Sequence, residues 1–260
     1  MNEHDKTLAR QVIALLDLTS LNDDDTEASI EALCQKALTP IGAVAAVCVY
    51  PRFVPLARRS LNALGGCDVK VATVCNFPGG EMPLAQVLEQ IRAALADGAD
   101  EIDVVYPYKA LLAGDTAQGL ALVAACKALC TEGRRLKVIL ETGQLPDALI
   151  RRASEDAIAA GADFIKTSTG KVQVNATPEA AQIMLEAIAA SGRDVGLKPA
   201  GGMRKLYDVT AYLWLAERLL GEDWVNPDHL RIGASSLLDN ILRQVGESTG
   251  QAEASAQGGY

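Results

Sequence analysis

Two lysines end short apolar runs, where a lysine is unusual. Lys166 ends the run Phe164–Lys166, and Lys198 ends the run Val195–Lys198. A surface lysine normally lies on a helix face, whereas a buried ammonium group needs a partner or a function. One interpretation is a pair of salt-bridged lysines that serves only the fold. The functional interpretation is an amine that attacks a carbonyl and forms a Schiff base, activated by a second cation nearby.

A lysine attacks a carbonyl only as the neutral amine. The pKa of a free lysine is about 10.4, so the group is almost wholly protonated at neutral pH. Two ammonium groups about 6 Å apart, at an effective dielectric constant near 20, repel by roughly 3 kcal/mol, or about two pKa units. Desolvation lowers the pKa further, so one lysine is expected to titrate at about pH 7 to 8. The residues alone leave open which lysine that is.

Bond making or breaking between carbons beside a Schiff base also needs a group that moves protons. Asp103 is the candidate, because alternation along Glu101–Val105 puts its carboxylate on the face opposite its apolar neighbours. Lys137 lies in an apolar strand between those of Asp103 and Lys166, and we expect it to ion-pair beneath them. A converging carboxylate and two amines would make a reactive site.

Glycine-rich segments near the two lysines could hold a phosphate group. One is Lys198–Arg204, and the other is Gly233–Ser236, which precedes a helical run from Leu237. Glycines let backbone N–H groups approach phosphate oxygens, serines donate hydrogen bonds, and a helix N-terminus favours an anion. A turn is the simpler interpretation of one such segment, but two of them favour phosphate. Gly170 and Lys171, after the sixth predicted strand, could add a further donor and a charge. The phosphate candidates are thus Gly170, Lys171, Gly201, Gly202, Gly233, Ser235 and Ser236.

Short apolar runs alternate with amphipathic stretches along nearly the whole chain, which predicts alternating strands and helices. Helix starts are marked by Asp23–Thr26, Pro83 and Thr177–Glu179. The eight predicted strands are Leu15–Thr19, Val44–Tyr50, Val69–Cys75, Glu101–Tyr106, Leu136–Glu141, Asp163–Thr167, Val195–Lys198 and Leu230–Gly233.

Eight such units in about 250 residues predict an α/β fold, a (β/α)8 TIM barrel in a single domain over residues 1–245. Residues 246–260, rich in Gly, Ser, Ala and Gln, are expected to form a flexible tail. An open doubly wound sheet is the alternative, although no GxGxxG motif follows the first strand. The related segments Gly98–Asp103 and Gly161–Lys166 place a carboxylate and an amine at equivalent heights of the fourth and sixth strands.

A barrel gathers its reactive groups at the C-terminal ends of the strands. Polar residues at other strand ends have simpler interpretations: Asp17 and Glu141 are typical of turn capping, and Cys48 of core packing. Cys48 is also a candidate for the wall of a pocket near the lysines.

Composition excludes several classes of function. The net charge of -9 disfavours nucleic acid or anionic lipid as partners, and two histidines are too few for a three-histidine zinc site. No apolar run approaches the roughly 18 residues of a membrane span. Six cysteines without a CxxC pair, behind a charged start at Asn2–Lys6, indicate reduced thiols and a soluble cytoplasmic protein.

Five motifs together resemble the 2-deoxy-D-ribose-5-phosphate aldolase family of class I aldolases. The resemblance covers Leu15 to Leu238 and extends to the terminal tyrosine. The motifs are FIKTSTGK at 164–171, LKPAGG at 197–202, EIDVV at 101–105, DLT at 17–19 and GASS at 233–236.

The resemblance implies a role for each reactive residue. Lys166 would form the Schiff base, Lys198 would lower its pKa, and Asp103 would relay protons through water. Asp17 and Thr19 would contact substrate hydroxyls, and the seven phosphate candidates match the residues that surround the phosphate group in this family. The terminal Tyr260 would assist proton transfer.

The implied reaction is reversible cleavage of 2-deoxy-D-ribose 5-phosphate to D-glyceraldehyde 3-phosphate and acetaldehyde, in deoxyribonucleoside catabolism, without metal or organic cofactor. Two alternatives remain open. One is another lysine-dependent barrel aldolase, transaldolase-like or acting on a keto acid. The other is a barrel that binds a phosphosugar without turnover. A homodimer is the commonest expectation for a soluble homo-oligomer.

Overall fold

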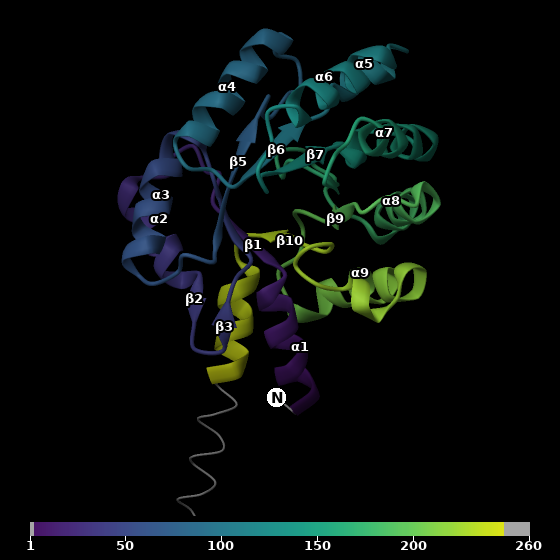
Figure 1. Cartoon of the computed structure of the whole chain (residues 1–260). Coiled ribbons are helices and arrows are strands. Elements are labelled where there is room, and N and C mark those ends of the chain that lie inside the picture. Colours follow the sequence, from purple (N-terminus) through teal and green to yellow (C-terminus); the bar gives the residue numbers. More distant parts are fainter. Residues whose placement is uncertain (1–2, 247–260) are drawn as a thin grey trace, which may run out of the picture.

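The chain folds into a ring of parallel strands surrounded by helices, in a computed structural model that describes residues 3–246 (Figure 1). The strands form one sheet in the order β10-β1-β4-β5-β6-β7-β8-β9. Isolated bridges from Leu197 to Leu230 and from Ala200 to Gly233 bring the two edges of this sheet together. The predicted single-domain (β/α)8 barrel is therefore confirmed. The predicted tail lies outside the described residues from residue 247 on.

Each of the eight predicted strands is present, and each is shorter than the apolar run that indicated it. The barrel strands are β1 (Leu16–Thr19), β4 (Ala46–Val49), β5 (Lys70–Cys75), β6 (Glu101–Val105), β7 (Arg135–Ile139), β8 (Phe164–Lys166), β9 (Gly196–Lys198) and β10 (Ile232–Ala234). Two further short strands, β2 (Leu38–Thr39) and β3 (Gly42–Ala43), pair with each other in antiparallel fashion outside the barrel.

Helices follow the strands where the sequence predicts them. They are α2 (Glu27–Lys36), α3 (Val54–Ala63), α4 (Leu84–Ala96), α5 (Tyr108–Leu112), α6 (Ala117–Lys127), α7 (Asp147–Ala159), α8 (Pro178–Ser191), α9 (Leu206–Leu220) and a last helix over 237–246. Single 3-10 turns form at η1 (Pro51–Phe53), η2 (Thr142–Gln144) and η3 (Glu222–Trp224). The N-caps predicted at Thr26 and Thr177 are confirmed. The Thr26 hydroxyl accepts a hydrogen bond from the Ser29 amide, and the Thr177 hydroxyl accepts one from the Ala180 amide.

One helix lies outside the predicted elements. The N-terminal segment, which the sequence analysis describes only by its charged start, forms α1 (Glu3–Ala14) before the first strand. Its apolar residues Ala9, Val12 and Ile13 are fully buried. The helix forms because these residues follow a helical spacing and pack on the core, which offsets its charged start. No helix within residues 3–246 is long and apolar enough to cross a membrane.

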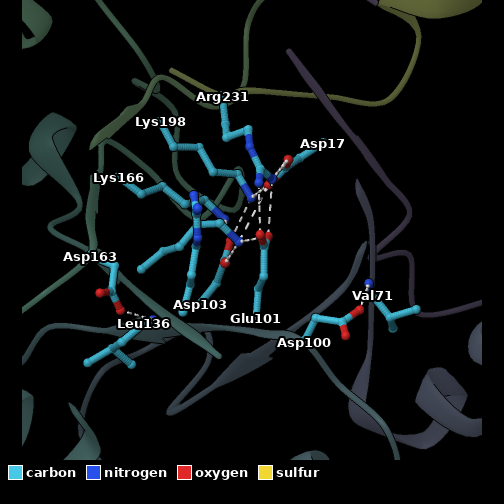
Figure 2. Close-up of polar contacts among 12 residues, drawn as sticks. Asp17, Val71, Asp100, Glu101, Asp103, Leu136, Asp163, Lys166, Lys198 and Arg231 are labelled. Carbon is cyan, nitrogen blue, oxygen red and sulfur yellow. Dashed lines mark hydrogen bonds and ion pairs between the residues drawn. The ribbon is translucent and has the colours of Figure 1, made fainter. Parts of the chain in front are cut away.

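The related segments Gly98–Asp103 and Gly161–Lys166 set the height of the reactive residues. Asp100 accepts a hydrogen bond from the Val71 amide on β5 at 2.8 Å, and Asp163 accepts one from the Leu136 amide on β7 at 2.7 Å (Figure 2). Each aspartate thus ties the start of its own strand to a neighbouring strand. Three residues further on come Asp103 and Lys166, whose side chains meet at 2.8 Å.

The inside of the barrel is divided into an apolar and an ionic part. Strands β4 and β5 contribute small apolar side chains, and Cys48, Ala72 and Val74 pack there with Leu21. The remaining interior holds seven charged side chains, which we call the ionic cluster. Its members are Asp17, Glu101, Asp103, Lys137, Lys166, Lys198 and Arg231. The larger apolar core lies outside this ring, between the strands and the helices.

Candidate active site

The ionic cluster converges on the centre of the barrel (Figure 2). Every member is at most 3% exposed to solvent. Strand alternation explains the convergence, because residues two apart on a strand share a face. The parallel register also brings the charged residues together, because Asp103 lies opposite Lys137, and Lys166 lies opposite Lys198, on neighbouring strands. Buried charges at this density require mutual pairing.

Asp103 lies at the middle of the cluster and accepts from three lysines. Its Oδ2 atom accepts from Lys166 at 2.8 Å and from Lys198 at 2.7 Å, while Oδ1 accepts from Lys137 at 2.9 Å. Burial acts to raise the pKa of Asp103, but the three lysine charges hold that pKa well below its usual value. Asp103 is therefore a carboxylate, and the expected convergence of one carboxylate with the amines is confirmed.

The two lysines that the sequence could not distinguish have different surroundings. Lys198 pairs with Asp103 and also with Asp17, at 2.5 Å, whereas the ion pair described for Lys166 is with Asp103. Burial lowers the pKa of Lys166, and the charge of Lys198 lowers it further against the pull of Asp103. For Lys198 burial also acts downward, but the two carboxylates outweigh it and raise the pKa. Lys166 is thus the lysine poised to be neutral.

The rest of the cluster contains Lys137, which the sequence predicts to form ion pairs, and also Glu101 and Arg231, which the sequence analysis missed. Lys137 pairs with Glu101 at 2.6 Å as well as with Asp103, so its predicted ion pairing is confirmed. Arg231 donates to Asp17 at 2.8 Å and to Glu101 at 2.8 Å. Glu101 could have been found, because it shares the inward face of β6 with Asp103. Arg231 could have been found in the same way, because a charged residue between the apolar residues Leu230 and Ile232 is unusual unless it is buried and paired.

A cavity of about 340 Å³ opens at the C-terminal ends of the strands, beside Lys166. All seven phosphate candidates and Thr19 line it, so the structure brings together segments that follow β8, β9 and β10. Asp103, Lys198 and Asp17 are not among its lining residues and lie buried in the cluster. Tyr260 lies outside the described residues. The other lining residues are Leu21, Asn22, Thr169, Asn175, Ala200, Met203, Arg204 and Ala234.

The walls of the cavity favour an anion. Gly201 has a φ of +81°, and a Cβ atom there would lie 2.9 Å from the side chain of Asn175, so this turn requires glycine. Ser235 and Ser236 directly precede the helix over 237–246, whose N-terminus carries partial positive charge. The Lys171 ammonium donates to the Leu21 carbonyl at 2.6 Å, which places a cation at the cavity wall.

Glu141 shapes this cavity indirectly. Its backbone is left-handed, with φ at +58°, and its buried carboxyl accepts from the Thr169 hydroxyl at 2.5 Å and the Thr169 amide at 3.1 Å. Burial raises the pKa of Glu141. Because Thr169 lines the cavity, Glu141 holds the loop after β8 in place, beyond the turn capping expected of it.

Asp17 lies deeper than its simpler interpretation suggested, whereas Cys48 packs in the core as its simpler interpretation predicts and is not among the residues that line the cavity beside Lys166. The Asp17 carboxylate is fully buried and pairs with Lys198 and Arg231, which turns a residue expected to cap a turn into a member of the ionic cluster. Cys48 is buried beside the cluster, and burial raises the pKa of its thiol. Thr19 donates its hydroxyl proton to the Asp17 carbonyl at 2.9 Å.

A (β/α)8 barrel that gathers buried charged side chains beside a cavity at the C-terminal ends of its strands has the arrangement of a barrel enzyme. Residues 11–225 match the model of the DeoC/LacD family aldolases. The chain belongs to this family and is therefore an aldolase, a carbon–carbon lyase.

Solved structures agree with this assignment. A provisionally assigned deoxyribose-phosphate aldolase from Toxoplasma gondii is 27% identical, with a TM-score of 0.87 over 95% of this chain and 98% of the other. The deoxyribose phosphate aldolase from Aeropyrum pernix, described as a tetramer, is 25% identical, with a TM-score of 0.71 over 95% and 99% of the two chains. A provisionally assigned enzyme of the same kind from Coccidioides immitis is 27% identical, with a TM-score of 0.78 over 91% and 86%.

Proposed function

We propose that this aldolase reversibly cleaves 2-deoxy-D-ribose 5-phosphate to D-glyceraldehyde 3-phosphate and acetaldehyde through a Schiff base on Lys166. The observation that carries the proposal is the unequal pairing of the two lysines, which favours a neutral Lys166 at the cavity and a protonated Lys198 buried beside it. The relatives named above support the substrate. The proposal also includes a cytoplasmic location and a role in deoxyribonucleoside catabolism. The reaction would need no metal and no organic cofactor.

In the cleavage direction, the Lys166 amine attacks the aldehyde carbon of the open-chain sugar, and loss of water leaves an iminium. Asp103, acting through water, takes the proton of the C3 hydroxyl. The C2–C3 bond then breaks, its electron pair moves into the iminium to give an enamine, and D-glyceraldehyde 3-phosphate leaves. Protonation of the enamine carbon and hydrolysis of the iminium release acetaldehyde and restore the amine.

The remaining predicted residues would bind or assist. The seven phosphate candidates line the cavity from three loops, which suits one phosphate group held by backbone amides, serine hydroxyls and Lys171. Contacts of Asp17 and Thr19 with substrate hydroxyls stay predictions; Thr19 lines the cavity, and Asp17 contacts Lys198 beneath it. The role of Tyr260 in proton transfer and the homodimer also stay predictions.

Trapping of the covalent intermediate tests the reaction. The full chain is incubated with 2-deoxyribose 5-phosphate or with acetaldehyde, reduced with borohydride, and mapped by peptide mass spectrometry. We expect one adduct, on Lys166, and turnover that a metal chelator leaves unchanged. Binding without an adduct would favour the phosphosugar-binding alternative, and selective trapping of another carbonyl compound would favour a different lysine-dependent aldolase. An adduct elsewhere, or activity abolished by the chelator, would contradict the proposal.

Removal of the two serine hydroxyls at the cavity tests the phosphate site. In Ser235→Ala/Ser236→Ala, KM for the phosphorylated sugar is expected to rise by at least about 10- to 100-fold, because each hydrogen bond to a charged group contributes about 1.5–3 kcal/mol. Borohydride trapping of acetaldehyde, which has no phosphate, should be unchanged. Ser191→Ala, at the distant end of α8, is the matched control. An equal effect on both substrates would argue against a phosphate-binding role.

A further inference from the structure

The ionic cluster reaches through the barrel to its opposite end. Glu101 and Arg231 form its last pair and line a second cavity, of about 590 Å³. This cavity lies at the N-terminal side of the barrel, because Glu101, Lys70 and Arg135 begin strands β6, β5 and β7. The other lining residues are Asp100, Glu132, Gly133, Arg134 and Asp228. Neither Glu101 nor Arg231 lines the cavity beside Lys166.

A continuous series of ion pairs links this pair to Lys166. Arg231 contacts Asp17 at 2.8 Å, and Asp17 contacts Lys198 at 2.5 Å. Lys198 and Lys166 then share one oxygen of Asp103, at 2.7 and 2.8 Å. A second route runs from Glu101 through Lys137 to Asp103, at 2.6 and 2.9 Å. In a buried cluster of this kind, a charge added or removed at one end acts on the other.

The cluster contains one more cation than it has carboxylates. Its cations are Lys137, Lys166, Lys198 and Arg231, and its carboxylates are Asp17, Glu101 and Asp103. With every group ionised, a buried net charge of one would remain, and such a charge is costly. Loss of one proton balances the cluster. Arg231, Lys198 and Lys137 each contact two or more carboxylates of the cluster. The proton is therefore lost from Lys166, whose ion pair within the cluster is with Asp103 alone.

We propose that Arg231 and Glu101 are positioning residues that set, from the opposite end of the barrel, the charge balance that keeps Lys166 unprotonated. The inference deepens the proposed function, since it concerns the amine that would form the Schiff base. Arg231 is the fourth cation, without which Lys166 would be needed as a charged partner. Glu101 limits the excess by neutralising part of the charge of Arg231 and Lys137.

The other groups around the two ends leave this balance intact. Cys48 faces Lys166 from β4, but its raised pKa keeps the thiol neutral. Glu141, two residues beyond the end of β7, interacts with the charge of Lys166, but burial raises the pKa of its carboxyl and so favours the neutral form. It belongs to no ion pair of the cluster and is the same in every variant below. Arg231 also lies over the Phe164 ring, 5.6 Å from its centroid.

Single variants should therefore move the protonation of Lys166 in opposite directions. Arg231→Met leaves three cations and three carboxylates, a balance that requires a charged Lys166. Glu101→Gln leaves four cations and two carboxylates, which drives the proton off more strongly. The double variant Glu101→Gln/Arg231→Met has three cations and two carboxylates, so one cation must again be neutral. Arg231→Lys keeps the charge count of the wild type.

The pH midpoint of Lys166 can be measured without enzyme activity, by competitive labelling of the full chain with acetic anhydride and mass spectrometry of the Lys166 peptide. We expect the midpoint to rise by about one pH unit in Arg231→Met and to fall by about one pH unit in Glu101→Gln. The double variant and Arg231→Lys should lie close to the wild type. Arg135→Met, which removes a partly exposed cation from the same cavity, is the matched control and should leave the midpoint unmoved.

Midpoints that stay fixed in both single variants, or that move in the same direction, would overturn the inference. A general loss of packing cannot imitate the expected pattern, because it would not restore the midpoint in the double variant. If Arg231→Met does not fold, Glu101→Gln and the double variant still decide. Failure of the proposed function is distinguishable, because it would appear as no borohydride adduct while the midpoints still shift. An adduct with unmoved midpoints would defeat this inference alone.

Discussion

Lys166→Met is expected to abolish the borohydride-trapped adduct and to lower kcat/KM by at least about 10⁴-fold, since the covalent route is lost as a whole. Methionine fills a similar volume but carries no amine. Peptide mapping after reduction and a coupled assay of aldehyde release measure the two effects. Lys36→Met, at an exposed pair with Asp239, is the control and should keep both adduct and activity.

The same variant should not lose folding stability at neutral pH. The pKa of Lys166 is lowered in the folded state, so the unfolded chain binds the proton more tightly and the wild type gains stability as pH rises towards the free-lysine value of about 10.4. Lys166→Met lacks this group, and its urea unfolding free energy should rise less between pH 7 and about pH 10. An adduct that persists on Lys198 in this variant would show that the reactive lysine was assigned wrongly.

Asp103→Asn is expected to have the largest combined effect on stability and turnover. Its carboxylate touches three buried lysines, and removal of one partner from a buried charge cluster costs about 3–5 kcal/mol. Loss of the proton-transfer group should slow turnover by about 10²- to 10⁴-fold. Urea unfolding measures the first effect. Hydrogen isotope exchange at the methyl carbon of acetaldehyde measures the second, because exchange requires the enamine.

The pH dependence of stability adds a separate check on Asp103. The pKa of this carboxyl is held well below its usual value, so its stabilising effect is fully present above the unfolded value of about 3.9 and is lost as pH falls below it. The wild type should therefore lose stability in acid more steeply than Asp103→Asn. Asp239→Asn, at the exposed pair with Lys36, is the control and should leave both the free energy of unfolding and the isotope exchange of acetaldehyde nearly unchanged. Unchanged stability and exchange in Asp103→Asn would refute a central role.

Much of the fold followed from local pattern. Apolar runs of strand length separated by capped helices indicated eight βα units, and Thr26 and Thr177 mark helix starts in the structure as they do in the sequence. The helix α1 was missed because its apolar residues, Ala9, Val12 and Ile13, are few and are stabilised by burial against the barrel. Helix formation that depends on tertiary packing leaves only a weak local signal.

Much of the candidate site followed as well. A lysine that ends an apolar strand must point inward or outward by alternation, so Lys166, Lys198 and Asp103 could be placed on the inner face. The glycine and serine segments after three strands could be assigned to one end of a barrel, and they line one cavity. Residue type and period are local properties, and the sequence alone was enough to read them.

The choice between the two lysines depended on the tertiary structure. Lys198 is held charged by Asp17 and Asp103, which lie 181 and 95 positions away in the chain (198 − 17 and 198 − 103). Arg231 completes the cluster by contacting Asp17, 214 positions away. Coulomb energy in a buried site changes by kilocalories over a few ångströms, and no local pattern specifies distances of that kind. The sequence thus determined which groups face the interior, while the closed barrel determined which of them form ion pairs with one another.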